Sequence, residues 1–171
     1  HAIAAVKAAR VQPGDVMVLI GIGPGCGMPE TYQITSALKY VKDGQRIALI
    51  TDGRFSGVST GACIGHVSPE AWADGPVARV RDGDRIRLHV DTRTLEGSID
   101  VISPEAAEFD ARPRHPSLRP DPRVPDDTRL WAALQNASGG SWGGCVYDAD
   151  RVARLLELGR EAEARLAAAP Q

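Results

Sequence analysis

Two apolar runs near the start of the chain predict its central strands. Val16 to Ile22 is a continuous run of mostly branched residues, too short for a buried helix and typical of a strand covered on both faces. Arg46 to Thr51 has the same character. Between them, Thr31 to Val41 places apolar residues at positions i, i+3, i+4 and i+7, which predicts an amphipathic helix. A strand, helix and strand in this order are typical of a parallel pair. His1 to Arg10 is Ala-rich and adds a short helix at the start.

Further along the chain the pattern becomes that of short antiparallel strands. We expect strands at Val77 to Val80, Arg85 to Val90 and Thr94 to Val101, because the middle run alternates apolar and polar residues. Asp82-Gly83 lies between two of these runs and is a strong hairpin signal. The predicted fold class is therefore α/β, with one mixed-sheet or barrel-like domain and flanking helices over residues 1–103.

Residues 104–171 have a different composition and predict a Pro-rich arm followed by a helical tail. Five prolines alternate with arginines between Ala111 and Pro125, which favours an extended arm. A helix capped by Asp126 or Asp127, a Gly-rich break and a last helix from Asp148 to Ala169 follow. A tail this small cannot form its own core, so we expect it to pack on the domain or on a neighbour. Its large aromatic residues, which should be buried there, are Trp131, Trp142 and Tyr147.

Charge and composition narrow the classes of partner. The chain has 171 residues, of which 43% are hydrophobic and 25% charged, and no apolar run approaches the roughly 20 residues of a membrane span. A net charge of −2 gives no drive towards nucleic acid or anionic lipid, and the Arg-rich arm lacks interleaved aromatic residues. We therefore expect a small-molecule partner, no nucleic acid and no membrane. The odd number of cysteines favours a reducing, cytoplasmic setting, and an opening at His1 without Met suggests a fragment.

The Gly-rich loop after the first strand does not match a nucleotide-binding motif. Counted from Gly21 or from Gly23, the third glycine of the dinucleotide fingerprint is replaced by Cys26 or Met28, and no Gly-Lys pair offers a P-loop. The loop ends in Pro29-Glu30 ahead of a helix. Glu30 is therefore either a carboxylate at the edge of a cavity or a residue that favours the helix dipole.

A second candidate loop, Thr51 to Gly57, follows the second strand. Because ligands collect at the carboxyl ends of parallel strands, this loop and the Gly-rich loop should face each other. Arg54 stands where a hydrolase elbow needs glycine, so Ser56 is either a site residue or a turn residue. A triad of Asp52, Ser56 and His66 is weakly indicated, because three such residues occur together often by chance.

The Cys63 and His66 pair has the spacing of half a zinc site. Because no second close pair exists, we expect no structural zinc and a buried Cys63.

Several long motifs occur together in order. They are Gly23 to Glu30 (GPGCGMPE), Ala48 to Gly57 (ALITDGRFSG), Gly61 to Ala71 (GACIGHVSPEA), Gly75 to Val77 and Val80 to Ile86. Over about residues 1–102 the chain strongly resembles the carboxy-terminal domain of the dihydroxy-acid dehydratase / phosphogluconate dehydratase family. The tail from Pro113 to Tyr147 is similar to the extension of the sugar-acid, xylonate-dehydratase-like branch.

The resemblance implies a hydro-lyase that converts a 2,3-dihydroxy acid or sugar acid into a 2-keto-3-deoxy acid. In such enzymes an amino-terminal domain holds an iron-sulfur cluster, 2Fe-2S or 4Fe-4S, and most of the Mg²⁺ ligands. The carboxy-terminal domain is a swivelling β-barrel that closes over that site. This chain would need its own amino-terminal domain as partner, would belong to a homo-oligomer at full length, and would be inactive alone.

The resemblance also assigns roles to residues. Glu30 would be the Mg²⁺ ligand of this domain, Ser56 the base that takes the C2 proton, and the loop amides at Ser56 and Gly57 would hold the substrate carboxylate. Serine can act as a base only where a cation and backbone donors stabilise its alkoxide. None of the cysteines is assigned to the cluster. The alternative is a stand-alone carboxylate-binding or regulatory module that has the fold without the catalysis.

Overall fold

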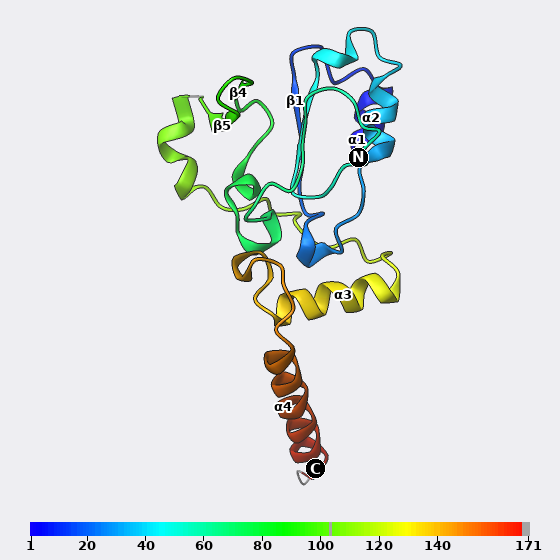
Figure 1. Cartoon of the computed structure of the whole chain (residues 1–171), viewed down its shortest axis with the longest axis vertical. Helices are drawn as coiled ribbons and strands as arrows, with labels where there is room; N and C mark the ends of the chain where they lie inside the picture. Colours follow the sequence, from blue (N-terminus) through cyan, green and yellow to red (C-terminus); the bar gives the residue numbers. More distant parts are fainter. Residues whose placement is uncertain (103, 169–171) are drawn as a thin grey trace.

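The computed structural model describes residues 1–102 and 104–168, which contain two small sheets flanked by helices (Figure 1). The first sheet is three-stranded with the order β1-β2-β3, and β4 and β5 form a separate antiparallel pair. This mixed α/β architecture agrees with the predicted fold class. The strand bounds are β1 Val16–Leu19, β2 Ala48–Thr51, β3 Cys63–Ile64, β4 Ile86–Asp91 and β5 Glu96–Val101.

The predicted parallel pair is confirmed. In β1 and β2, Val16 lies opposite Ala48 and Leu19 lies opposite Thr51. β3 adds a third parallel strand on the other side of β2, which the sequence pattern did not predict. Two helices, α1 (Ala2–Lys7) and α2 (Tyr32–Leu38), pack beside this sheet, and apolar side chains from α1 and α2 close a core around Leu49. The paired strands therefore bring the loops that follow them to one edge of the sheet.

The strand predicted at Val77 to Val80 is wrong. This segment forms a short 3-10 helix, η4 (Pro76–Arg79), which contacts another, η3 (Ala71–Ala73). Proline at the first helical position has no N–H to leave unpaired and a backbone angle suited to a helix start. Val77 and Ala78 are buried with Ala71, so apolar burial here reflects helical packing.

The hairpin predicted at Asp82-Gly83 is also wrong. That dipeptide forms the turn that leads from η4 into β4, while the hairpin turn itself lies between β4 and β5. Asp91 closes the hairpin turn, because its carboxylate accepts the backbone N–H of Arg93 at 2.8 Å and of Thr94 at 3.3 Å. A local side-chain hydrogen bond thus sets the turn in place of the expected glycine.

The two sheets do not close into a barrel within residues 1–102 and 104–168. They are separated by a largely apolar cavity of about 390 Å³. Val18 and Ile50 line it from the parallel sheet, and Ile86 and Ile99 line it from the hairpin.

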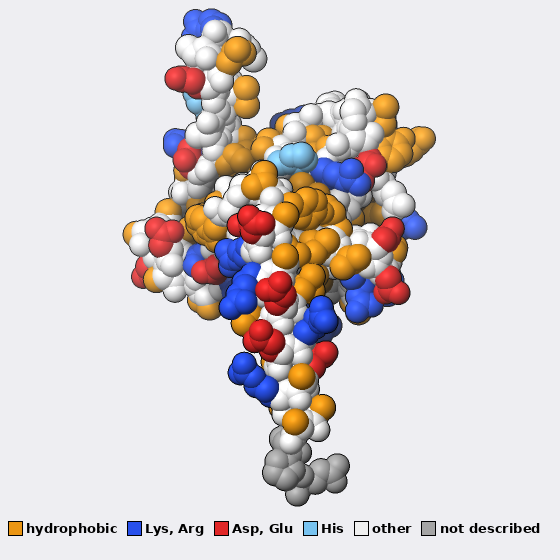
Figure 2. Space-filling view, turned by 60° about the horizontal axis from the view of Figure 1, so that its bottom comes forward, with side chains coloured by type: hydrophobic (Ala, Val, Ile, Leu, Met, Phe, Trp, Pro, Cys, Tyr) orange, Lys and Arg blue, Asp and Glu red, His pale blue; other side chains and the backbone are white. Residues whose placement is uncertain are grey.

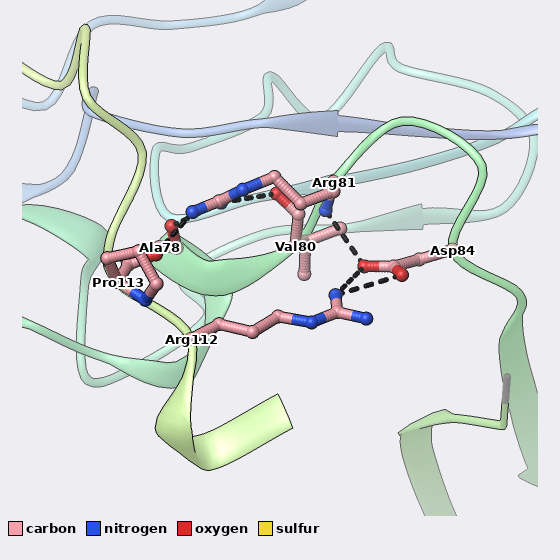
Figure 3. A network of polar contacts seen from close by, with 6 residues as sticks. All are labelled: Ala78, Val80, Arg81, Asp84, Arg112 and Pro113. Carbon is pink, nitrogen blue, oxygen red and sulfur yellow. Dashed lines mark hydrogen bonds and ion pairs between the residues drawn. The ribbon is translucent and has the colours of Figure 1, made fainter. Parts of the chain in front are cut away.

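The arm after the domain is tied to it by hydrogen bonds (Figure 3). Arg112 donates from one nitrogen to both carboxylate oxygens of Asp84, at 2.9 and 2.7 Å. The backbone N–H of Arg81 also donates to Asp84, at 2.8 Å, and the Arg81 guanidinium donates to the carbonyl of Pro113. The arm is therefore anchored to the segment that precedes β4. A further 3-10 helix, η5 (Pro104–Ala111), leads into it.

Beyond the arm lie α3 (Asp126–Ala137), the 3-10 helix η6 (Gly140–Gly143) and α4 (Ala149–Ala167), close to the predicted helices. The indole N–H of Trp142 donates to the carbonyl of Ala73 at 2.8 Å. Trp142 nevertheless stays 72% exposed and Tyr147 52% exposed, so the domain does not bury these two side chains, and their burial against a neighbour stays a prediction. Trp131 is half-buried.

The last helix leaves the body of the molecule. α4 projects away from the sheets, contains no buried residue and carries basic and acidic side chains along its length (Figures 1 and 2). The carboxylate of Asp148 caps its start by accepting the N–H of Arg151 at 2.9 Å. The predicted helix end at Ala169 and the domain boundary at residue 103 lie outside the described residues. In the described part of the chain, no helix combines the length and apolarity needed to cross a membrane.

Candidate functional site

The loops that carry Glu30 and Ser56 lie side by side, as predicted from the parallel strands. Glu30 forms an isolated parallel bridge with Arg54. The N–H and the hydroxyl of Thr31 both donate to the carbonyl of Arg54, at 3.1 and 3.0 Å. The Nε of Arg54 donates back to the carbonyl of Met28 at 2.9 Å. Ser56 follows two residues after this junction.

The two candidate side chains differ in their surroundings. Glu30 is exposed, and no side chain or N–H in residues 1–102 and 104–168 donates to its carboxylate. Ser56 is half-buried, and its Oγ accepts the N–H of Val58 at 3.3 Å, a long hydrogen bond. Gly57 is exposed, and nothing lies within 4 Å of the position a Cβ would take there. Ser56 therefore shapes a turn, and its Oγ has a backbone donor beside it, while the open space lies at the neighbouring Gly57.

Asp52 lies beneath both loops and is 1% exposed. Its carboxylate accepts three backbone N–H groups, from Gly21 and Ile22 at 3.1 Å each and from Ala71 at 3.0 Å. Burial raises the pKa of Asp52, and the three hydrogen bonds oppose that rise only in part. One side chain thus joins the start of the Gly-rich loop, the loop of Ser56 and the start of η3.

Glu70 is a second buried carboxylate, also 1% exposed. Its Oε1 accepts the N–H of Gly25 at 2.8 Å and the hydroxyl of Ser141 at 3.0 Å, while Oε2 has no partner in the described part of the chain. Burial raises the pKa of Glu70, and the charge of Asp52 adds to the rise. A Cβ at Gly23 would overlap the Glu70 carboxylate, so the loop needs glycine there in order to pack on Glu70.

The tail covers the outer side of the Gly-rich loop. The 3-10 turn of this loop, η1 (Pro24–Cys26), contacts both α3 and η6. A Cβ at Gly25 would lie 2.9 Å from Oδ1 of Asn136, and one at Gly27, whose φ is +92°, would lie 2.6 Å from Cγ2 of Thr128. Small residues therefore let α3 approach the loop closely.

An open pocket of about 520 Å³ lies between the loops and α3. Arg54, Asp127 and Thr128 give it polar groups, and Trp131 gives it an aromatic wall. Gly27 and Met28, just before Glu30, complete the lining of the pocket.

The weaker motifs do not form sites in the described residues. No hydrogen bond there joins Asp52, Ser56 and His66, because the Asp52 carboxylate is occupied by backbone donors and His66 is exposed. The thiol of Cys63 donates to the carbonyl of Thr60 at 3.3 Å and is half-buried, not fully buried as expected. No group of three or more His, Cys, Asp and Glu residues is placed to hold a metal within residues 1–102 and 104–168.

These surroundings decide which cofactors the chain could help to hold. Glu30 offers one unengaged carboxylate, a hard oxygen donor that suits Mg²⁺ as a single ligand completed from elsewhere. The cysteines do not suit an iron-sulfur cluster, which binds thiolates. Burial, with the charges of Glu70 and Asp52, raises the pKa of Cys26 to about 12, and it forms no ligand group with Cys63 or Cys145.

Sequence reasoning missed Glu70 and the anchoring role of Asp52. The signal for Asp52 was present, since an acid directly after a buried strand lies at the loop edge of a sheet. For Glu70, no local pattern distinguishes a buried acid from the other exposed acids of the chain. Its burial depends on Gly25 and Ser141, which are distant from it in sequence.

Comparison with known proteins agrees with the resemblance. Residues 1–141 match the family model described as dihydroxy-acid/6-phosphogluconate dehydratase C-terminal. Two Escherichia coli K12 proteins, D-xylonate dehydratase YagF and D-xylonate dehydratase YjhG, are 53% and 50% identical over 95% and 91% of this chain. A dihydroxy-acid dehydratase of Nocardioides sp. is 49% identical over 65% of it. The chain covers 26%, 26% and 20% of the lengths of these relatives. It therefore belongs to the dihydroxy-acid/6-phosphogluconate dehydratase family and corresponds to the C-terminal region of its members.

Proposed function

We propose that this chain is the C-terminal part of a hydro-lyase that dehydrates a sugar acid to a 2-keto-3-deoxy acid. The relatives that match it over more than nine-tenths of its length are named D-xylonate dehydratases, which supports a sugar acid of this kind as substrate. The observation that carries the proposal is the bridge between Glu30 and Arg54, which brings the only unengaged carboxylate of the two loops close to Ser56.

In this proposal Glu30 supplies one ligand to Mg²⁺, and the other ligands come from the amino-terminal domain. When bound, Mg²⁺ would stabilise negative charge that develops on the substrate. The cluster would be held by that other domain, because the cysteines of this chain do not suit it.

Ser56 acts as the base that takes the C2 proton onto its Oγ. The Ser56 hydroxyl first gives its own proton to solvent, and the N–H of Val58 is already directed at Oγ, where it would stabilise the resulting alkoxide. As Oγ takes the C2 proton, the electron pair of the C2–H bond forms a C2=C3 bond, the C3–O bond breaks and hydroxide leaves. The enol that results rearranges to the 2-keto-3-deoxy acid. The amides at Ser56 and Gly57 hold the substrate carboxylate in the open space beside Gly57. Arg54 is fixed to Met28 and forms the border between this space and the pocket under α3.

The pocket suits the remaining hydroxyl groups of a sugar acid. Asp127 offers acceptor oxygens, although its Oδ1 already accepts the N–H and the hydroxyl of Thr128, and Trp131 offers a face for C–H groups.

We further propose the domain division suggested by the sequence. Residues 1–103 would act as the swivelling, barrel-like domain that closes over the amino-terminal domain, and residues 104–171 as the arm and tail. The hydrogen bonds between Arg112 and Asp84 support the arm as a fixed part of this unit. The complete enzyme would be a homo-oligomer in a reducing, cytoplasmic setting, in which the three free cysteines are stable.

The test of Ser56 uses the full-length, cluster-loaded protein with D-xylonate as the first substrate. Ser56→Ala should keep metal content and lower turnover by about 10² to 10⁴-fold, the contribution typical of a positioned base. Ser59→Ala is the matched control, because this serine lies two residues beyond the loop and its hydroxyl oxygen accepts from the hydroxyl of Thr35 at 3.3 Å. Turnover within twofold of wild type in Ser56→Ala would leave that residue a turn residue only.

The test of Glu30 measures the Mg²⁺ concentration that gives half-maximal activity. Glu30→Gln should raise it, because a charged oxygen ligand is lost from a hard cation. Glu96→Gln, an exposed acid in β5, is the control. An unchanged Mg²⁺ dependence in Glu30→Gln would return Glu30 to a helix-dipole role.

A further inference from the structure

We infer that Asp52 is a positioning residue that fixes the metal-ligand loop against the loop of the base. The inference rests on the proposed function, since it concerns the alignment of Glu30 with Ser56. Asp52 itself is 1% exposed and is placed to act through the backbone.

Asp52 and Arg54 hold the two loops together at separate points. At the start of the Gly-rich loop, Asp52 accepts the N–H groups of Gly21 and Ile22. At its end, the carbonyl of Arg54 accepts from Thr31, beside Glu30. The loop between these points is thus fastened at both ends to the segment that leads to Ser56.

Close packing supports the same junction. A Cβ at Gly53 would lie 2.9 Å from side-chain carbons of Ile22 and 3.1 Å from its carbonyl oxygen. The backbones at residues 22 and 53 are therefore already as near as a glycine allows. Asp52 also accepts the N–H of Ala71, the residue after Glu70. Glu70 in turn accepts the N–H of Gly25, in the middle of the Gly-rich loop, so Asp52 helps to fix this part of the loop as well.

The chemistry of the acceptor explains why a carboxylate is needed. Three N–H donors converge on one side chain, with two of them on Oδ2 and one on Oδ1. An asparagine at this position would have one acceptor oxygen, and its NH₂ group would face a backbone N–H. Asp52→Asn should therefore release at least one donor and shift the loop of Glu30 relative to Ser56.

The experiment measures kcat, KM and the Mg²⁺ dependence of full-length Asp52→Asn. We expect kcat to fall and the half-maximal Mg²⁺ concentration to rise, each by about 10- to 100-fold, the range typical when a residue that supports a metal ligand is changed. A role in stability alone would reduce the folded fraction and leave both constants of the folded enzyme unchanged.

Asp84→Asn is the matched control, because Asp84 is also a buried acceptor of several donors but lies in the junction with the arm (Figure 3). It should lower the melting temperature and leave kcat and the Mg²⁺ dependence within twofold of wild type.

A second variant keeps the inference testable if Asp52→Asn does not fold. Gly53→Ala retains every charge and pushes Ile22 away from the junction, so it should alter the same two constants by a smaller, severalfold amount. If Asp52→Asn folds and its kcat and half-maximal Mg²⁺ concentration both stay within twofold of wild type, the inference is overturned. If Asp52→Asn does not fold, the same result for Gly53→Ala overturns it. Failure of the proposed function is seen separately, as normal constants in Ser56→Ala and Glu30→Gln.

Discussion

Two junctions in this molecule are built on buried carboxylates, but their electrostatics are opposite. Asp84 faces the guanidinium of Arg112 at 2.7 Å. Burial raises the pKa of Asp84, yet the hydrogen bonds from Arg112 and from the backbone of Arg81 outweigh it, and the net pKa is lowered. Asp52 and Glu70 accept only neutral donors, and burial raises the pKa of both.

The difference indicates that the junction at Asp84 stabilises the arm, whereas the junction at Asp52 and Glu70 sets the geometry of the loops. The arm junction neutralises its charge and serves to hold residues 112 and 113 in place. The loop junction uses two buried acids, Asp52 and Glu70, and no cation is among their hydrogen-bond partners in the described part of the chain. Oε2 of Glu70 has no partner at all in the described residues, so the electrostatic interactions of this junction do not favour the stability of the fold. Proteins accept such costs where loop geometry matters for function.

The largest expected effect comes from removing the arm and tail together. Deleting residues 111–171 removes Arg112 and the cover of α3 over the Gly-rich loop. It should lower the unfolding free energy by more than about 2 kcal/mol, since the hydrogen bonds of Arg112 to a carboxylate alone are worth about that much. The control deletes residues 149–171, which include no described buried side chain, and should cost less than about 1 kcal/mol. Equal urea midpoints for the two truncated chains would make the tail an independent appendage.

Arg112→Ala tests the arm junction alone. It removes the cation from the half-buried Asp84 and should cost about 1.5 to 3 kcal/mol at pH 7, the range for hydrogen bonds to charged groups. Because the folded pKa of Asp84 is lowered, this stabilisation is present above the ordinary value of about 3.9 and is lost as the pH falls through the folded pKa. Urea unfolding from pH 7 down to pH 3 should therefore show the gap between wild type and Arg112→Ala narrowing below about pH 4. A gap independent of pH would mean that Arg112 acts by packing.

The smallest expected effect concerns Glu70. Its raised folded pKa means that stability is fully present below the ordinary value of about 4.3 and declines as the pH rises through the folded pKa. Glu70→Gln retains an acceptor for Gly25 and Ser141 and should flatten this decline. Unfolding free energies between pH 4 and 8 test this, with the exposed Glu108→Gln as control. If the unfolding free energy of Glu70→Gln falls with pH as steeply as that of wild type, then the buried charge of Glu70 does not cause the fall.

The parts of the structure that the sequence predicted are those set by local pattern. The apolar run of β1, the run of β2 and the helix between them determined the parallel pair, and the pair in turn placed Glu30 beside Arg54. The errors arose where one pattern has two physical causes. The apolar residues at 77 and 78 suit a strand or a buried 3-10 turn, and Pro76 decided for the turn. Asp82-Gly83 suits any tight turn, whereas the hairpin turn forms where the side chain of Asp91 accepts the backbone N–H of Arg93.

The interior polar contacts could not be predicted because they join distant segments. Glu70 meets Ser141 and Arg112 meets Asp84 only after the tail has folded back on the domain. The exposure of Trp142 has the same origin, since its indole N–H finds a carbonyl at the surface while the ring finds no cover.

The close packing of Gly23 on Glu70 limits which residues can replace Gly23 during evolution. No side chain larger than hydrogen fits at position 23 while a glutamate fills position 70. The Cβ of residue 70 would itself lie 2.6 Å from a new Cβ at position 23, so a shorter side chain at position 70 does not open the space; only glycine there, or a shift of the backbone, would do so. Position 23 should therefore stay glycine during evolution and in a directed library unless the backbone around position 70 changes with it.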